Sequence, residues 1–159
     1  MAVVLENSNL VKQKIKIALG NADPVHQDTF NDLVRYLATQ GGNPDLQFVA
    51  FSAEQATTNT GTDLTAAACK VYGWYAKARR TTGTTSSFVS IHAEATNGAT
   101  TTTLVTARFK AVNQNASQVM PRGLACETGL TISAATAVGG ATESSAADVA
   151  DGFIIIGAA

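Results

Sequence analysis

The amino-acid sequence predicts a mainly β protein, a sandwich or barrel of short strands, with one α-helix near its N-terminus. Three observations support this fold class. From residue 46 onward, short runs of alternating apolar and polar residues recur, separated by turn-forming Gly, Pro, Asn and Thr residues. Residues 28–42 carry the clearest helical spacing of apolar side chains. Residues 153–156 form a continuous apolar run, which is typical of a buried, central strand.

The composition indicates a weakly charged chain that fits one domain. It has 159 residues, of which 14% are charged, and its net charge at pH 7 is −1. This charge provides no field that would recruit nucleic acid or an anionic membrane, so neither is an expected partner. No apolar run approaches the roughly 18 residues that span a bilayer. The N-terminus lacks the features of a secretory signal, so we expect synthesis in the cytoplasm.

Residues 11–19 are the first expected element. Apolar and basic side chains alternate here, which predicts a strand with lysines on its outer face. The competing prediction is a helix that begins after Ser8, because Leu10, Lys14 and Ile17 also align at helical spacing. The dipeptide that follows at residues 23–24, Asp-Pro, predicts a turn.

The helix is expected at residues 28–42, and His26 is expected to belong to the turn before it. Asp28 is a suitable N-cap, and Gly41 and Gly42 would end the helix. One apolar stripe should pack on the sheet or on a neighbouring subunit, and it consists of Phe30, Leu33, Val34 and Leu37.

A short strand at residues 46–50 and a polar loop at residues 55–63 come next. The loop is expected to join two parts of the chain. Residues 1–63 would be an N-terminal arm, strand and helix that pack on the sandwich or on a neighbour, and residues 64–159 would be the β-sandwich. The two parts are expected to form one structural unit.

Residues 69–93 form the centre of the strand-rich part. Two strand-like runs are joined here by a basic turn, which predicts a hairpin. In the first run, Tyr72 and Trp74 should share one face of the strand, and Val71 and Tyr75 the other.

The remaining strands are expected later in the chain. Residues 104–111 alternate with Val105, Ala107 and Phe109 facing inward. Residues 124–137 predict two strand pieces, and residues 153–156 the final buried strand.

The sequence contains no motif for binding a nucleotide, metal or cofactor. His92 and Glu94 lie two residues apart on one strand face, an arrangement open to a hydrolase, although a structural polar pair is the preferred interpretation. We therefore assign no catalytic, cofactor-binding or metal-binding residue. Cys69 and Cys126 are expected to be buried free thiols, with a disulfide between neighbouring strands as the alternative.

The order of several segments is informative. They are KVYGWYAK, a polar turn, SFVSIHAEAT, an alternating strand, a proline-containing bend, GLACETGLTISAATA, an acidic loop of small residues and a final FIIIGA. Over residues 67–158 this order resembles that of tailed-bacteriophage virion proteins of the capsid cement or decoration type. The chain departs from the family pattern at Ala78, Arg79 and Arg80, where small polar residues are usual.

The resemblance implies a non-enzymatic β-sandwich, often jelly-roll-like, on the outer surface of a virion capsid. The expected fold is therefore mainly β, a jelly-roll-like sandwich with one N-terminal helix and a short lead-in. The partner would be the major capsid protein, whose subunits the chain would bridge and stabilise. Binding at symmetry-related junctions favours a homo-oligomer, either a trimer or a dimer. No cofactor is expected.

Partner contacts are expected at three places in the chain. The N-terminal residues could dock as a strand on a partner's sheet edge, the basic turn could touch a partner directly, and the aromatic run could do so through its tryptophan. The residues concerned are Val3, Val4, Leu5, Arg79, Arg80 and Trp74.

Two other functions are left open. The first is a head or tail fibre module that holds glycans through Trp74 and the neighbouring tyrosines. The second and more remote is a hydrolase built around His92 and Glu94.

Overall fold

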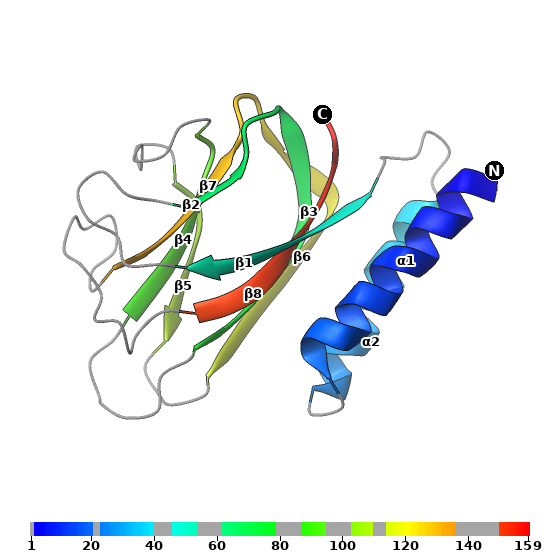
Figure 1. Ribbon diagram of the computed structural model, residues 1–159, viewed down its shortest axis with the longest axis horizontal. Coiled ribbons are helices and arrows are strands. Elements are labelled where there is room, and N and C mark those ends of the chain that lie inside the picture. The colour runs from blue at the N-terminus through cyan, green and yellow to red at the C-terminus, as the bar shows by residue number, and fades with distance from the viewer. Residues whose placement is uncertain are drawn as a thin grey trace.

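A computed structural model of the chain describes residues 2–20, 23–39, 46–53, 62–78, 87–94, 103–109, 114–135 and 150–159. These residues form two helices followed by strands that belong to two antiparallel sheets (Figure 1). The elements are α1 (Ala2–Leu19), α2 (Pro24–Thr39), β1 (Gln47–Ala53), β2 (Thr62–Thr65), β3 (Cys69–Ala78), β4 (Ser87–His92), β5 (Thr103–Phe109), β6 (Asn115–Cys126), β7 (Leu130–Ala135) and β8 (Ala150–Ala158). The described part of the chain is therefore mainly β, as predicted.

The elements are stacked in three layers. The strand order is β1-β8-β3-β6 in the first sheet and β2-β7-β4-β5 in the second. One apolar core fills the space between the two sheets, and a second core lies between the first sheet and the helices. Figure 1 shows the helices on the side of the first sheet that faces away from the second.

The strand pairs are nested along the chain. β1 pairs with β8, β2 with β7, β3 with β6 and β4 with β5, all antiparallel. Two further pairs, β3 with β8 and β4 with β7, join these pairs into the two sheets. Each of the first four strands, β1 to β4, thus pairs antiparallel with one of the last four, β5 to β8.

The prediction of a buried central strand at the end of the chain is confirmed. β8 lies between β1 and β3, and Phe153, Ile154 and Ile155 are all 0% exposed. Ile154 faces the second sheet, whereas Phe153 and Ile155 face the helices. A strand that is covered on both faces has no polar side, which explains its continuous apolar sequence.

Residues 11–19 are helical, so the predicted strand is wrong and the competing helix is correct in type, although α1 begins at Ala2 and not after Ser8. The chain therefore has two helices before its strands in place of the one predicted. The buried side chains are Val11, Ile15 and Leu19, at i, i+4 and i+8. A strand would have placed Ile17 on the same side as Ile15, yet Ile17 is 81% exposed. The alternation of lysines with apolar residues fits the two periods equally well over nine residues, and packing against α2 selects the helix.

The N-cap of α2 lies five residues earlier than predicted. The backbone N–H of Gln27 donates to the carbonyl oxygen of Asp23 at 3.1 Å, so Asp23, rather than Asp28, is the N-cap. Pro24 occupies the first helical position, where its fixed φ is favourable and its missing N–H costs nothing. His26 therefore lies in the first helical turn and not in a loop. The predicted apolar stripe is confirmed, since α2 buries Phe30, Leu33, Val34 and Leu37.

The predicted hairpin at residues 69–93 is wrong. β3 pairs with β6 and β8 in the first sheet, whereas β4 pairs with β5 and β7 in the second. The chain between them, which includes Arg79 and Arg80, lies outside the described residues. Two strand pieces were predicted at residues 124–137. They are the end of β6, in the first sheet, and the whole of β7, in the second sheet, so they too do not pair with each other.

A bulge in β3 also changes which aromatic residues share a face. The register of β3 with both of its neighbours shifts between Val71 and Gly73. Val71 and Trp74 consequently face the second sheet, while Tyr72 and Tyr75 face the helices. The face assignment from simple alternation is therefore wrong, since a bulge inserts one residue and reverses the pattern beyond it.

The predicted division of the chain near residue 63 falls inside β2. β1 and β2 both precede residue 66, yet each is a member of a sheet, β1 beside β8 and β2 beside β7.

Neither helix in the described ranges is long and apolar enough to cross a lipid bilayer.

Candidate functional site

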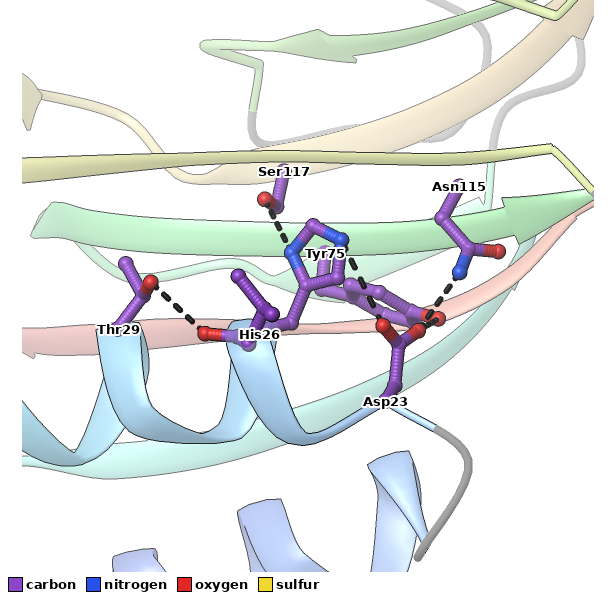
Figure 2. A network of polar contacts seen from close by, with 7 residues as sticks. Asp23, His26, Thr29, Tyr75, Asn115 and Ser117 are labelled. Carbon is purple, nitrogen blue, oxygen red and sulfur yellow. Dashed lines mark hydrogen bonds and ion pairs between the residues drawn. The ribbon is translucent and has the colours of Figure 1, made fainter.

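A polar cluster joins the start of α2 to the first sheet (Figure 2). We define it by five residues: Asp23, His26, Tyr75, Asn115 and Ser117. The first two belong to the N-terminal end of α2, Tyr75 to β3 and the last two to β6. β3 and β6 are direct neighbours, with Tyr75 opposite Ser117, so the sheet register brings the strand residues of the cluster side by side.

Asp23 is the shared acceptor of the polar cluster. Its Oδ2 accepts hydrogen bonds from the Tyr75 hydroxyl at 2.8 Å and from Nδ2 of Asn115 at 2.6 Å. Its Oδ1 lies 3.7 Å from Nε2 of His26. The Asp23 carboxylate therefore connects the N-terminal end of α2 to β3 and β6 (Figure 2).

His26 extends the cluster along β6. Its Nδ1 is hydrogen-bonded to the Ser117 hydroxyl at 2.8 Å, and its ring meets the edge of Tyr75 with the ring centroids 5.3 Å apart. Both ring nitrogens therefore face groups of the protein itself (Figure 2).

The electrostatics of the polar cluster favour a structural role. Burial raises the pKa of Tyr75, and the hydrogen bond to Asp23 together with the negative charge of that carboxylate raises it further. The phenol therefore stays protonated and donates to Asp23 at every ordinary pH. A phenol held in this way cannot serve as a base or nucleophile.

A cavity of about 370 Å³ adjoins the polar cluster. Its polar lining comes from Asp23, Tyr75 and Asn115, together with Lys77 and Asp151. Side chains of α1, β1 and β8 supply the apolar lining, which includes Leu19, Phe51 and Phe153. This volume is at the lower end of the range for small-molecule pockets. The cavity can hold ordered water or a small polar molecule, but three of its five polar residues already bond to one another.

The polar cluster should contribute measurably to stability. Replacing Asp23→Ala removes the negative charge at the N-terminus of α2 and leaves the Tyr75 hydroxyl and the Asn115 amide without their acceptor. We expect a loss of about 2–4 kcal/mol in the free energy of unfolding, measured by urea denaturation. Asp28→Ala, in the same helix but exposed, is the matched control and should change stability by less than about 0.5 kcal/mol. Equal losses in the two variants would show that the cluster contributes nothing.

His92 is a second polar residue, in the second sheet, and it is only 2% exposed. Its Nδ1 is hydrogen-bonded to Oγ1 of Thr103 at 3.1 Å and its Nε2 to Oγ of Ser133 at 2.8 Å. Both ring nitrogens therefore bond to hydroxyl groups. Glu94 acts on His92 through its charge. The pair considered for a hydrolase thus has no hydrogen-bonded carboxylate that orients the imidazole, as a catalytic triad requires.

Burial of His92 should make the protein less stable in mild acid. Burial lowers the pKa of His92 below its usual value of 6.5, and the Glu94 carboxylate opposes this effect. As the pH falls below about 6.5, the unfolded chain binds a proton that the folded chain does not, so the free energy of unfolding decreases. We expect urea unfolding to show this decrease between pH 7 and pH 5. The His92→Gln variant should have a shallower pH dependence over the same range, and identical slopes would refute the assignment.

Cys69 and Cys126 are free and buried, as predicted, and they lie directly opposite each other on β3 and β6. Burial raises the pKa of both thiols, that of Cys126 to about 12, where the adjacent Cys69 adds to the effect. Because the thiolate is the reactive form, neither cysteine is activated as a nucleophile.

The residues expected to contact a partner lie in different environments. Val3, Val4 and Leu5 belong to α1, so their backbone is helical and not an extended strand. Trp74 is 5% exposed and lies in the core between the sheets, where its Nε1 has no hydrogen-bond partner among the described residues. Arg79 and Arg80 lie outside the described residues.

The aromatic platform considered for glycan binding is not exposed. Tyr72 and Tyr75 are 6% and 5% exposed and pack between the first sheet and the helices. Trp74 faces the opposite way. The three rings therefore do not share a surface.

Sequence reasoning missed the polar cluster. Its hydrogen bonds join residues 52 to 92 positions apart, and no local pattern reveals such contacts. The available signal was the Asp-Pro pair at residues 23–24, which is typical of an N-cap followed by the first helical residue.

No protein-family model matches the chain, and a search of curated protein sequences finds no relative. Within the part of the chain that the structure describes, no group of three or more His, Cys, Asp or Glu residues is placed to hold a metal ion.

Proposed function

We propose that this chain is a non-enzymatic virion structural protein, a capsid cement or decoration protein that bridges major capsid protein subunits from the outer surface of the shell. The observation that carries the proposal is the nested pairing of the strands. Two further observations support it. Residues 67–158 resemble such virion proteins, and buried polar side chains are hydrogen-bonded to other groups of the protein.

The nested pairing supports a jelly-roll assignment. In a jelly roll, a long antiparallel ribbon is wound into two four-stranded sheets, so that the first strand pairs with the last and the second with the one before it. The pairs β1 with β8, β2 with β7, β3 with β6 and β4 with β5 follow this rule. Jelly rolls recur in viral capsid proteins and in lectins.

Since one fold hosts many functions, the choice between these two depends on the residues. The glycan-binding alternative depended on stacking of sugars on Tyr72, Trp74 and Tyr75, and all three rings are buried. The burial of these rings favours the capsid function over the glycan-binding alternative.

The use of the polar side chains also favours a structural role. His26 and His92 bond to hydroxyl groups of the protein, and the Tyr75 hydroxyl bonds to Asp23. These groups hold elements together and are not directed at a substrate. A cement protein acts through extended surfaces, where many weak contacts across subunit boundaries must break together.

The test is the location and effect of the protein in phage particles. Cryo-EM of the particle whose genome encodes the chain should show it at symmetry-related sites on the outside of the shell, at full occupancy. Particles that lack the gene should lose DNA at a lower temperature than the wild type, and purified protein added back should restore the wild-type temperature. A low copy number at the tail tip, or absence from the particle, would overturn the proposal.

Two variants give the add-back experiment a matched control. Gly20→Ala is expected to fold and should restore thermal stability to the particles. Gly152→Ala is expected not to fold and should fail. Restoration by both would indicate that the folded chain is not the active species.

A further inference from the structure

The outer face of the helix layer carries an apolar stripe. All four large apolar side chains that are exposed in the described part of the chain belong to the helices. On α1 they are Leu10, 51% exposed, and Ile17, 81% exposed; on α2 they are Val25, 74% exposed, and Tyr36, 48% exposed. We call these four residues the helix stripe. The sheets present no comparable residue within the described ranges.

The spacing of these residues gives each helix one apolar line. Leu10 and Ile17 are seven residues, or two turns, apart, on the side of α1 that faces away from the buried Val11 and Ile15. On α2, Val25 and Tyr36 are eleven residues, or three turns, apart. Each helix therefore buries one stripe in its own chain and exposes another.

The charges of the two helices differ. α1 carries Lys12, Lys14 and Lys16, of which Lys14 lies beside the helix stripe, four residues after Leu10 and three before Ile17. The exposed acids of α2 are Asp28 and Asp32, which lie beside Val25 and Tyr36 at the same helical spacing. Asp32 forms an exposed ion pair with Arg35 at 3.1 Å. Within the part of the chain that the structure describes, the three lysines and Asp28 make no ion pair with one another or with other groups. One helix thus offers unpaired positive charge and the other negative charge.

We propose that a second copy of this chain packs on the helix stripe, with α1 of one copy antiparallel to α2 of the other about a two-fold axis parallel to the helices. The inference deepens the proposed function and rests on it, because binding at symmetry-related junctions of a capsid favours a homo-oligomer. A two-fold axis makes the same contact twice, which suits a surface that carries both complementary charges.

The register of the helices supports this arrangement. α1 ends at Leu19 and α2 begins at Pro24, and the two helices run antiparallel. Counting back from Leu19 along α1 therefore corresponds to counting forward from Pro24 along α2. Ile17 is then level with residue 26, next to Val25. Lys14 is level with residue 29, between Asp28 and Asp32. The two-fold axis preserves these levels, so in the dimer Ile17 meets Val25 and Lys14 meets the two aspartates. Leu10 and Tyr36 are offset by three positions, or about 4.5 Å along the helix axis, a distance that a tyrosine side chain spans.

The size of the surface predicts a weak dimer. At 1.5 Å per residue the 18-residue α1 is about 27 Å long, and two helices side by side are about 20 Å wide. The face is therefore roughly 500 Å² per copy, or about 1,000 Å² in total, which is at the low end for specific interfaces. We expect dissociation in the micromolar range, so that monomer and dimer coexist in solution.

Sedimentation velocity of the full chain over a concentration series tests the inference. The wild type should shift from monomer to dimer as its concentration rises. Ile17→Lys should remain monomeric at every concentration. Because position 17 is exposed, its circular dichroism and melting temperature should equal those of the wild type at concentrations where the wild type is also monomeric. Gln118→Lys adds the same charge at an exposed position of β6 and should dimerise like the wild type.

Charge reversal tests the orientation of the two copies. Lys14→Asp and Asp28→Lys should each weaken dimerisation by about ten-fold, because each attraction becomes a repulsion at two symmetric places. The double variant should return to within about two-fold of the wild type. A double variant that is weaker than either single variant would overturn the proposed pairing of α1 with α2.

The outcomes separate this inference from the proposed function. A chain that is monomeric at all concentrations but occupies the capsid would overturn the inference and leave the function intact. If Ile17→Lys also prevented such a monomer from binding particles, the helix stripe would belong to the capsid protein and not to a second copy. A dimer with the predicted variant behaviour that is absent from particles would support the inference and overturn the function.

Discussion

Gly152→Ala is expected to prevent the first sheet from assembling. Gly152 lies on β8 between its partners Phe51 on β1 and Ala76 on β3. A β-carbon added at this position would overlap the carbonyl oxygen of Tyr75 and lie 2.6 Å from Cζ of Phe51 and 2.9 Å from Cα of Ala76. Two of these three atoms belong to the backbone of the neighbouring strand, so no side-chain rotation relieves the overlap.

The cost of this change should approach the whole stability of the domain. Ordinary overpacking costs about 1–3 kcal/mol, but it is relieved by movement of side chains. Here the central strand must separate from β3, and total stabilities are about 5–15 kcal/mol. We expect the variant to accumulate as insoluble protein and, once solubilised, to show no cooperative thermal transition.

Gly20→Ala is the matched control, because it adds the same methyl group. Gly20 has a φ of 62° but no atom within 4 Å of the added carbon. Only the left-handed backbone conformation opposes the change, at a cost of about 1–2 kcal/mol. A Gly152→Ala protein as stable as Gly20→Ala would show that β8 does not pack this closely against β3.

Phe153→Ala is expected to cost about 3–5 kcal/mol, the second-largest effect. Phe153 is 0% exposed and its ring contacts three other rings. The centroid distances are 4.9 Å to Phe30, 4.8 Å to Phe48 and 5.5 Å to Tyr75. One side chain thus connects α2, β1 and β3 with β8, and its loss leaves a cavity that all four elements border.

Urea denaturation measures this effect, with Phe88→Ala as the control. Phe88 is half-buried on β4, with the Arg108 guanidinium 5.6 Å from its ring centroid. Its removal should cost about 1–2 kcal/mol, because less apolar area leaves water on folding. Similar losses at the two positions would indicate that the core between the helices and the first sheet is loosely packed.

Features that depend on a single local period could be predicted from the sequence. The buried stripe of α2 and the central position of β8 follow from apolar spacing alone, and both are confirmed. The burial of Cys69 and Cys126 followed from their apolar strand context and is also confirmed.

Features that depend on distant contacts could not be predicted. Residues 11–19 fit a strand and a helix equally well until α2 is present to cover Val11 and Ile15. β3 and β4 were expected to pair with each other, but β3 pairs with β6 and β8, whereas β4 pairs with β5 and β7. The bulge between Val71 and Gly73 has one local signal, the isolated glycine inside the strand run, which the assumption of simple alternation ignored. The polar cluster depends on β6 lying beside β3, so it could not be foreseen before the sheet was known.

The nested strand order also bears on how the chain folds. β1 has β8 as its sheet neighbour, so Gln47 must find Ile156 before the first sheet can close. Contacts this far apart in sequence carry a high loop-closure cost and slow the folding rate. A ribosome-bound chain that still lacks β8 would expose the unpaired edges of β1 and β3, which are a template for aggregation. The first sheet is therefore expected to close slowly, and only after β8 has left the ribosome.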